Sequence, residues 1–247
     1  GVILARLLSP KEFGLIGMTV VFITLSQAFI DSGLSQSLVR KKDCTQKDYS
    51  TIFYFNLAVG VFFYFLLFLL AEPIGLFLNE SRLADIVRVV GTVLIINSFS
   101  IIQKVILAKR IDFKLQTKIS IFSSIVSGAV AICMAYAGFG VWSLAWKTII
   151  MYFLTTILLW MWNAWFPVRI FSCDALREHF KFGYKLLISG LINAVYVNIY
   201  YLIIGKFYSA ADVGYYSRAE QFSNLPAINI ANIIHRVSYP ALSQLQD

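Results

Sequence analysis

Three stretches of this chain each run for about twenty residues without a charged side chain. They are Ile52–Ala71, Ile119–Ala137 and Leu186–Ile204. An α-helix rises 1.5 Å per residue, so about 20 apolar residues cross the roughly 30 Å hydrocarbon core of a bilayer. Strands of a membrane barrel are shorter and alternate in polarity, which these stretches do not do. The sequence therefore predicts an all-α polytopic membrane helix bundle.

Less pure apolar runs bring the expected number of spans to seven. Hydrophobic residues make up 59% of the chain and charged residues only 14%, against about 25% charged residues in soluble domains. Gly1–Leu8 has the character of the end of an earlier span, and we expect the chain to be a piece of a longer protein. The four additional runs are Gly14–Ile30, Ile86–Gln103, Val141–Trp162 and Val213–Ile234.

The net charge of +8 follows from how lysine and arginine alternate between the spans. Basic residues gather in the segments 40–47, 109–118 and 169–185, whereas the connections between them along the chain hold few. Membrane proteins keep their basic connections on the cytoplasmic side. The pattern therefore predicts one topology with these three segments in the cytoplasm, and it explains the charge without nucleic-acid binding.

The segment Ser172–Lys185 differs from the spans because its apolar and charged residues alternate with a helical period. Leu176, Phe180 and Tyr184 recur every four residues, which predicts an amphipathic helix on the membrane surface. We accordingly divide the chain into an N-terminal lobe at 1–166, a cytoplasmic interfacial linker helix at 167–185, and the start of a C-terminal lobe at 186–247.

A short motif occurs twice, 200 residues apart. LLSPKEFGLIG begins at Leu7 and FYSAADVGYYS at Phe207, so that Ser9, Glu12 and Gly14 are matched by Ser209, Asp212 and Gly214. A serine followed three residues later by an acidic residue favours a reciprocal cap at the start of a helix. Six expected spans separate the copies, which returns the second copy to the same side. We interpret this as a parallel repeat, two six-helix lobes related by an axis along the membrane normal, of which the chain holds the first lobe and part of the second.

The chain resembles the polysaccharide transporter family, the Wzx-type flippases of lipid-linked oligosaccharides. The resemblance is carried by ILARLLSPKEFG, DSGLSQSLVR, FGYKLLISGLIN and GKFYSAADVGYYSRAEQF. This family belongs to a superfamily that includes multidrug-exporting MATE proteins and the lipid II flippase, and the chain corresponds to about half of a family member. The resemblance implies a MATE-like monomer of the bacterial cytoplasmic membrane that needs no cofactor. It implies transfer of an undecaprenyl-pyrophosphate-linked glycan to the outer leaflet, for O-antigen, capsule or exopolysaccharide synthesis.

Polar residues within the expected spans are the candidate site, because charge inside a bilayer usually faces a cavity or a partner. Arg218, Lys147 and Arg88 are candidates for binding the pyrophosphate, in that order. Gln221 and Asn224 are candidates for sugar contacts, and Asp31 and Glu220 for ion coupling. Each cation also has a structural interpretation. Arg218 could form an ion pair with Asp31, Glu220 or another helix and so hold the bundle together, Lys147 could reach to the membrane surface, and Arg88 could lie at headgroup depth.

Two other functions remain as alternatives. A MATE-like drug/cation antiporter needs carboxylates within the membrane, and Asp31 and Glu220 are the candidates. A membrane-embedded glycan polymerase or ligase would usually carry a large polar outer loop, and none is visible in the sequence. Catalytic motifs are absent, His179 and His235 are the only histidines, and Cys44, Cys133 and Cys173 are scattered, so we expect neither enzymatic activity nor a metal site.

Overall fold

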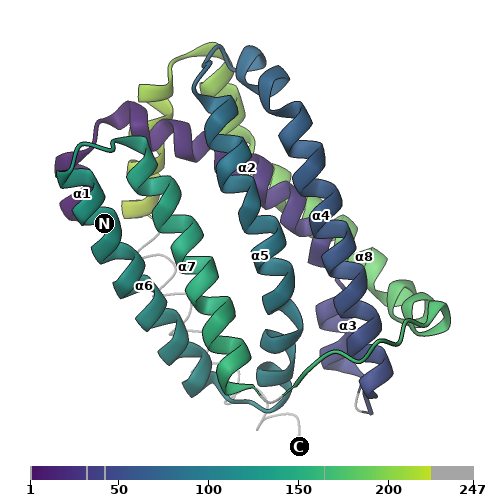
Figure 1. Cartoon of the computed structure of the whole chain (residues 1–247). Coiled ribbons are helices and arrows are strands. Elements are labelled where there is room, and N and C mark those ends of the chain that lie inside the picture. Colours follow the sequence, from purple (N-terminus) through teal and green to yellow (C-terminus); the bar gives the residue numbers. More distant parts are fainter. Residues whose placement is uncertain (1, 32, 42, 164, 224–247) are drawn as a thin grey trace, which may run out of the picture.

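Six long apolar helices make up most of the fold (Figure 1). The computed structural model describes residues 2–31, 33–41, 43–163 and 165–223, and in these residues all regular structure is helical. The elements are α1 (Val2–Leu7), α2 (Pro10–Asp31), α3 (Leu34–Arg40), α4 (Gln46–Phe77), α5 (Leu83–Lys109), α6 (Phe113–Tyr136), α7 (Val141–Trp162) and α8 (Cys173–Phe207).

The expected all-α bundle and six of the seven expected spans are confirmed. These six helices, α2 and α4 to α8, are each long and apolar enough to cross a membrane. The seventh expected span, Val213–Ile234, begins in a helix over 210–223, and the rest of it lies outside the described residues. Between Ser9 and Ser209 the chain forms six long helices, as the apolar runs predicted.

The expected cap is present at both copies of the repeated motif, and it is reciprocal at the second, where the Asp212 amide also donates to the Ser209 hydroxyl at 3.3 Å. The backbone amide of Ser9 donates to Glu12 Oε2 at 2.6 Å, and the Ser9 hydroxyl donates to the same oxygen at 2.9 Å. The Ser209 amide and hydroxyl donate to Asp212 Oδ2 at 3.0 and 2.6 Å. Each cap satisfies backbone groups that the first turn of a helix leaves without partners, so each fixes the start of a helix.

The helix expected at Ser172–Lys185 forms, but it does not end at Lys185. Ser172 caps the helix as expected, its hydroxyl accepting from the Ala175 amide, but α8 then continues through Lys185 to Phe207. No proline or capping residue interrupts the chain there, and the four-residue spacing of exposed apolar side chains continues from Tyr184 to Ile188. The linker and the following span are one 35-residue helix, so the expected lobe boundary after Lys185 falls inside α8.

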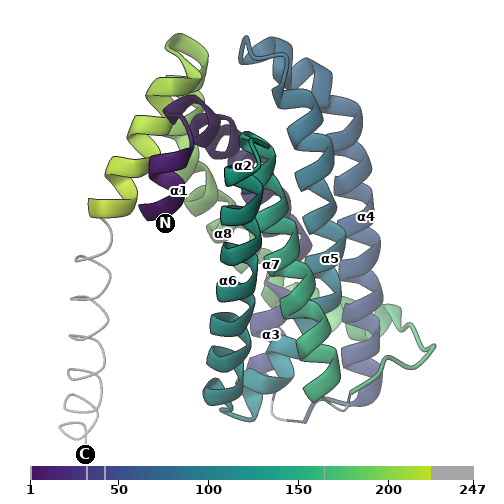
Figure 2. The ribbon, with the colours of Figure 1, turned by 60° about the vertical axis from the view of Figure 1, so that its left-hand side comes forward.

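The helices pack as a bundle that α2 crosses obliquely (Figures 1 and 2). Helix α2 contacts α4 and α5 on one side and α8 on another, while α5 and α6 both pack against α7. The helix over 210–223 lies beside the start of α2 (Figure 2). The largest apolar core joins α2, α4 and α5, and includes Met18, Ile30, Leu67, Leu83, Val87 and Leu94.

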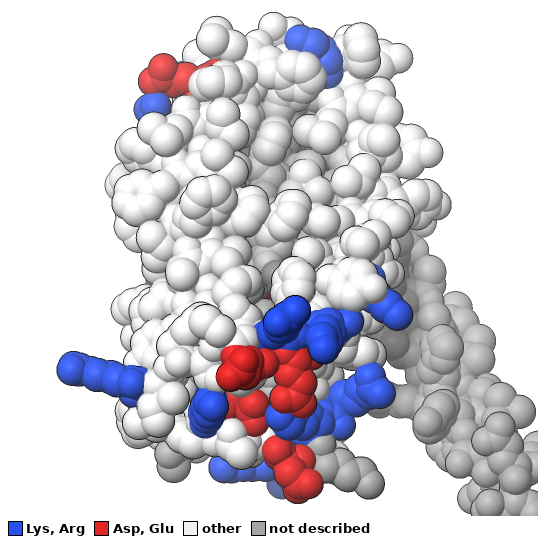
Figure 3. All heavy atoms as spheres, turned by 90° about the vertical axis from the view of Figure 1, so that its right-hand side faces the viewer, with Lys and Arg blue, Asp and Glu red and all other residues white. Residues whose placement is uncertain are grey.

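Charged residues divide the bundle into two unlike ends. Figure 3 shows lysine, arginine and carboxylate side chains crowded at one end of the visible face, a broad uncharged band, and few charges at the other end. The crowded end, here called the basic end, holds the described residues of the connections after α3, α5 and α7, which are 41, 43–45, 110–112, 163 and 165–172. Gln46 Nε2 donates to the Phe166 carbonyl at 2.6 Å across two of these connections. The expected grouping of basic segments at one end is thus confirmed for the described residues, and Lys42 lies outside them.

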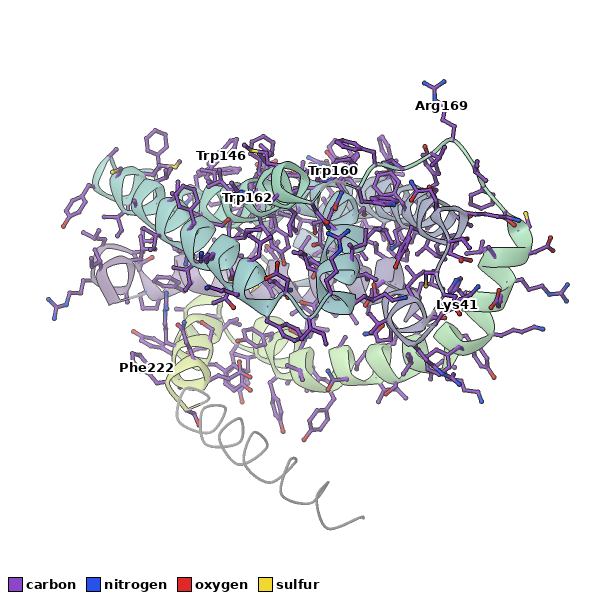
Figure 4. All side chains as sticks on the ribbon, turned by 90° about the horizontal axis from the view of Figure 1, so that it is seen from below. Lys41, Trp146, Trp160, Trp162, Arg169 and Phe222 are labelled. Atoms are coloured by element: carbon purple, nitrogen blue, oxygen red, sulfur yellow. The ribbon has the colours of Figure 1, made fainter. Side chains whose placement is uncertain are left out.

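The opposite end holds the turns before α2, after α4, between α6 and α7, and after α8. Lys11 pairs with Glu80 at 2.8 Å, and Lys206 Nζ donates to the Phe77 carbonyl at 2.7 Å. Seen from the basic end, Trp146 and Trp162 lie along the outer edge of the bundle, and Arg169 projects away from it (Figure 4). Exposed tryptophans of this kind suit the membrane surface.

Candidate functional site

Two of the three candidate cations line one cavity near the opposite end of the bundle. This cavity, here called the upper cavity, has a volume of about 380 Å³. Lys147 reaches it from α7, and Arg218, Glu220 and Gln221 from the helix over 210–223. The remaining wall consists of Phe13, Ile16, Gly17, Val20, Leu144, Thr148, Tyr201 and Ser217. Residues distant in the sequence are therefore brought to one site, and Asn224, the remaining sugar candidate, lies outside the described residues.

Arg218 is held by an aromatic ring and an amide. Its guanidinium carbon lies 3.4 Å from the centroid of the Phe13 ring, and its Nη1 donates to Gln221 Oε1 at 2.7 Å. Its Nε is buried without a hydrogen-bond partner, and no carboxylate of the described residues lies within 4.0 Å of it. The expected alternative, an ion pair with Asp31 or Glu220, is therefore not formed among these residues. Donor groups of Arg218 remain available for an anionic ligand.

Glu220 has a partner of its own within the same cavity. The Tyr201 hydroxyl of α8 donates to Glu220 Oε2 at 2.6 Å. Tyr201 also packs against Tyr216 with ring centroids 5.3 Å apart, which fixes the hydroxyl in place. The carboxylate is thus bound to a neutral donor and leaves the positive charge of Arg218 uncompensated by a direct contact.

Arg88 does not join the other two cations. Its Nη2 donates to Glu72 Oε1 at 2.7 Å, its Nη1 lies 3.8 Å from Asp85 Oδ1, and its guanidinium carbon lies 5.1 Å from the Phe68 ring centroid. Because α4 extends beyond the apolar run to Phe77, Glu72 lies beside the second turn of α5. Arg88 does not line the upper cavity, and its contacts are those of a residue that joins α4 to α5.

A larger cavity lies toward the basic end. This lower cavity has a volume of about 630 Å³, between α2, α3, α5 and α8, with Gln116 of α6 at its edge. Asp31 lines it, whereas Glu220 lines the upper cavity, so the two candidate coupling carboxylates occupy different sites. The other polar residues that line the lower cavity include Thr24, Gln27, Ser35, Gln36, Asn97, Lys104, Asn193 and Asn198.

Sequence reasoning missed Lys104 and the polar contacts around it. The apolar run was ended at Gln103, but α5 continues to Lys109 and carries Lys104 into the lower cavity. Lys104 Nζ donates to Asn97 Oδ1 at 3.1 Å, two helical turns away on the same face of α5. The spacing of seven residues between Asn97 and Lys104 places them on one face of a helix, and it could have been read from the sequence.

A buried polar network closes the basic end between α3, α4 and α8. His179 is 2% exposed, with Nδ1 2.8 Å from the Ser37 hydroxyl and Nε2 3.4 Å from Asp48 Oδ1. Lys41 lies beside this network (Figure 4) and pairs with Asp48 at 3.4 Å and Glu178 at 3.1 Å. Burial lowers the pKa of Lys41, but the hydrogen bond that its Nζ donates to Glu178 and the charge of the nearby Asp48 carboxylate outweigh burial, so the lysine pKa lies above its ordinary value.

Comparison with known proteins identifies relatives named for the biosynthesis of teichuronic acid and lipopolysaccharide and for the biosynthesis and transport of succinoglycan. The chain is 26% identical to the teichuronic acid biosynthesis protein TuaB of Bacillus subtilis, over 89% of this chain and 46% of TuaB. It is 24% identical to the succinoglycan biosynthesis transport protein ExoT of Rhizobium meliloti, over 98% of this chain and 49% of ExoT. It is 25% identical to the lipopolysaccharide biosynthesis protein WzxC of Escherichia coli, over 99% of this chain and 50% of WzxC.

The chain spans about half the length of these relatives. No solved structure matches it significantly. The described helices and the relatives together show a multi-pass membrane protein. The family model described as polysaccharide biosynthesis protein matches residues 3–247, nearly the whole chain. The chain therefore belongs to the polysaccharide biosynthesis protein family, as its resemblance to polysaccharide transporters predicted.

Proposed function

We propose that the complete protein is a flippase for lipid-linked oligosaccharide. It moves a glycan attached to undecaprenyl pyrophosphate from the cytoplasmic to the outer leaflet of the bacterial cytoplasmic membrane, for surface polysaccharide synthesis. It works as a monomer by alternating access. The basic end faces the cytoplasm, because basic connections stay on that side.

The upper cavity is the observation that carries this proposal. Lys147 and Arg218 line it together, and neither contacts a carboxylate of the described residues within 4.0 Å. Uncompensated cations within a membrane are costly and are typical of a site that receives an anion. The guanidinium fork matches phosphate oxygens, and the amide of Gln221 suits a sugar hydroxyl. A pyrophosphate with its first sugar has the chemistry that this lining can bind.

Alternating access requires two lobes, and the repeated motif supports such an arrangement. A Cβ atom added to Gly14 would collide with the carbonyl oxygen of Ala210, and one added to Gly214 would collide with that of Pro10. Pro10 and Ala210 are themselves 200 positions apart, as are the two glycines. In this contact the glycine of each copy faces the backbone of the other copy at the matching position, which is typical of two-fold symmetry. We propose that the contact joins two lobes related by an axis along the membrane normal.

The cation antiporter is the weaker alternative. A carboxylate site for a cation would be strongest if Asp31 and Glu220 shared it, but they line different cavities and Glu220 accepts a hydrogen bond from Tyr201. The positive side chains of the upper cavity favour an anionic molecule.

Replacement of Arg218 in the complete protein tests this function. We expect Arg218→Ala, at normal membrane abundance, to reduce surface polysaccharide at least about tenfold and to trap lipid-linked precursor on the cytoplasmic side, because a charged hydrogen bond worth about 1.5–3 kcal/mol is lost. Arg218→Lys should retain part of the activity, since it keeps the charge and loses the fork. The measurements are surface glycan and precursor accumulation in the same cells.

Arg88→Ala is the matched control, because Arg88 pairs with Glu72 outside the cavity. We expect this variant to export normally. Normal export by Arg218→Ala would remove Arg218 from the proposed site. Loss of export in all variants without trapped precursor would contradict a flippase.

A further inference from the structure

Lys104 is a cation in the lower cavity that the proposed upper site does not use. It follows the first residue of α5, Leu83, by 21 positions, which places it about 32 Å from the opposite end of the bundle. Lys147 follows the first residue of α7, Val141, by six positions, about 9 Å from the same end. The two lysines are therefore separated by about 23 Å along the bundle, toward opposite ends of it.

The surroundings of Lys104 leave its charge without a direct counter-ion. Its Nζ donates to the neutral oxygen of Asn97 at 3.1 Å, an oxygen that also accepts from the Ser100 hydroxyl at 3.1 Å. No carboxylate of the described residues lies within 4.0 Å of Nζ. Asp31 lines the same cavity without reaching it, and Asp31 Oδ1 is itself buried without a hydrogen-bond partner. Charged side chains within a membrane usually face a cavity or a partner, and a polar molecule between Lys104 and Asp31 would give both charges a direct partner.

The room around Lys104 suits a polar ligand larger than an ion. The lower cavity holds about 630 Å³, within the range of small-molecule sites. Lys104 and Gln116 also line a neighbouring cavity of about 460 Å³ between α5, α6 and α7. Gln27 of the lower cavity donates to Tyr152 of the neighbouring one at 3.3 Å. Lys104 thus stands where the two spaces meet, among amides and hydroxyls that bind sugar hydroxyls well.

The lower and upper cavities follow the same pair of helices. The α2 residues of the upper cavity end at Val20, and those of the lower cavity begin at Thr24, about one turn further on. On α8, Asn198 belongs to the lower cavity and Tyr201 to the upper one. A molecule that moves along α2 and α8 therefore passes Lys104 before it reaches Lys147 and Arg218.

We propose that Lys104 is a first anion-binding site for the transported molecule, in the half of the membrane nearer the basic end. This inference rests on the proposed function. Lys104 binds an anionic group of the lipid-linked glycan, which then passes to Lys147 and Arg218. The amides of the lower cavity bind the sugars that follow, and Asp31 accepts from a sugar hydroxyl.

The anionic group has two sources, the pyrophosphate and a carboxylate on an acidic sugar. Two soluble probes separate them: farnesyl pyrophosphate, which carries a prenyl pyrophosphate, and glucuronate, which carries a sugar carboxylate. Binding of each to the purified complete protein is measured by calorimetry. We expect Lys104→Met to raise the Kd of one probe about tenfold, and that probe names the source. Lys104→Arg should bind the same probe nearly as well as the natural protein. An unchanged Kd for both probes in Lys104→Met overturns the proposal.

Thermal stability separates a binding role from a structural one. Methionine has a similar length, and replacing a buried charge that lacks a contacting opposite charge by an apolar residue leaves stability unchanged or raises it. We therefore expect Lys104→Met to melt no lower than the natural protein. A clear loss of stability, without change in either Kd, would assign Lys104 to the packing of α5. Lys118→Met, at an exposed position of α6, is the matched control and should change neither quantity.

Transport in cells distinguishes failure of this inference from failure of the proposed function. If both hold, Lys104→Met and Arg218→Ala each trap precursor on the cytoplasmic side. If only Arg218→Ala traps precursor, the flippase stands and Lys104 is not a binding site. If neither traps precursor, the proposed function fails and the inference fails with it.

Discussion

At the scale of single residues, Gly14 and Gly214 have the most stringent environment in the described fold. Each lies against a backbone carbonyl of the other helix, Ala210 for Gly14 and Pro10 for Gly214. A side chain at either position would meet backbone that cannot rotate away, unlike the end of a flexible side chain. Small residues allow membrane helices to approach this closely.

We predict that Gly14→Ala and Gly214→Ala each destabilise the protein, by about 1–3 kcal/mol, the usual cost of overpacking. The double variant should cost less than the two single changes together, because both act on one contact. Gly128→Ala is the control, since an added Cβ at Gly128 of α6 meets nothing within 4 Å and should leave stability unchanged or raise it. Thermal unfolding of the purified complete protein measures all four. Equal stability of Gly14→Ala and the natural protein would contradict the contact.

The sequence predicted the membrane-spanning helices well, but it predicted less well which cavity or partner the polar residues near their ends would face. Lys147 and Arg218 were singled out because each stood within an expected span, and the structure brings them to one cavity. Arg88 also stood within an expected span, but its partner Glu72 was not considered because the preceding expected span ended at Ala71. Lys104 was not among the candidate site residues because the expected span ended one residue earlier, at Gln103. Hydropathy locates the hydrocarbon layer but not where a helix ends, because polar turns continue helices beyond the membrane.

At the scale of elements, α8 combines two roles that the sequence suggested were separate. Its first half carries an amphipathic pattern, and its second half is a span. The His179 network holds the first half to α3 and α4, through Ser37 and Asp48. Asp48 also caps α4 with Thr45, accepting from its amide at 2.8 Å. One buried carboxylate therefore fixes both the start of α4 and the position of α8, which periodicity along a single segment cannot reveal.

We predict that Asp48→Asn destabilises the protein by about 2–3 kcal/mol, because it weakens charged hydrogen bonds at a side chain that is only 5% exposed. It should also speed proteolysis of the 165–172 connection, since the first half of α8 loses its hold on α3 and α4. Glu178→Gln is the matched control. Glu178 pairs with the same Lys41 but is 61% exposed, so its loss should cost below about 1 kcal/mol. Equal effects of the two changes would remove Asp48 from this role.

At the scale of the whole molecule, the two ends of the bundle are closed by different chemistry. The basic end is held by buried polar groups around His179. The opposite end is held by backbone contact at the two glycines and by Lys206, whose Nζ bonds the Phe77 carbonyl and lies 4.5 Å from the Phe77 ring centroid. Between them lie the two cavities along α2 and α8. A transporter that alternates its opening must break one of these closures at a time, since each joins α8 or the following helix to the rest of the bundle.

This arrangement predicts that a covalent link at the opposite end stops transport. In a version of the complete protein without native cysteines, Phe77→Cys and Lys206→Cys are joined by a short, reducible bifunctional thiosulfonate. We expect export of surface polysaccharide to stop on linking and to return on reduction, because α8 can no longer separate from the end of α4. Lys11→Cys with Glu80→Cys is the matched control: these residues pair at 2.8 Å, and both lie within the proposed first lobe. Linking the control pair should leave export unchanged. Continued export by the fully linked Phe77→Cys, Lys206→Cys protein would show that the opposite end opens elsewhere, or that α8 moves together with α4.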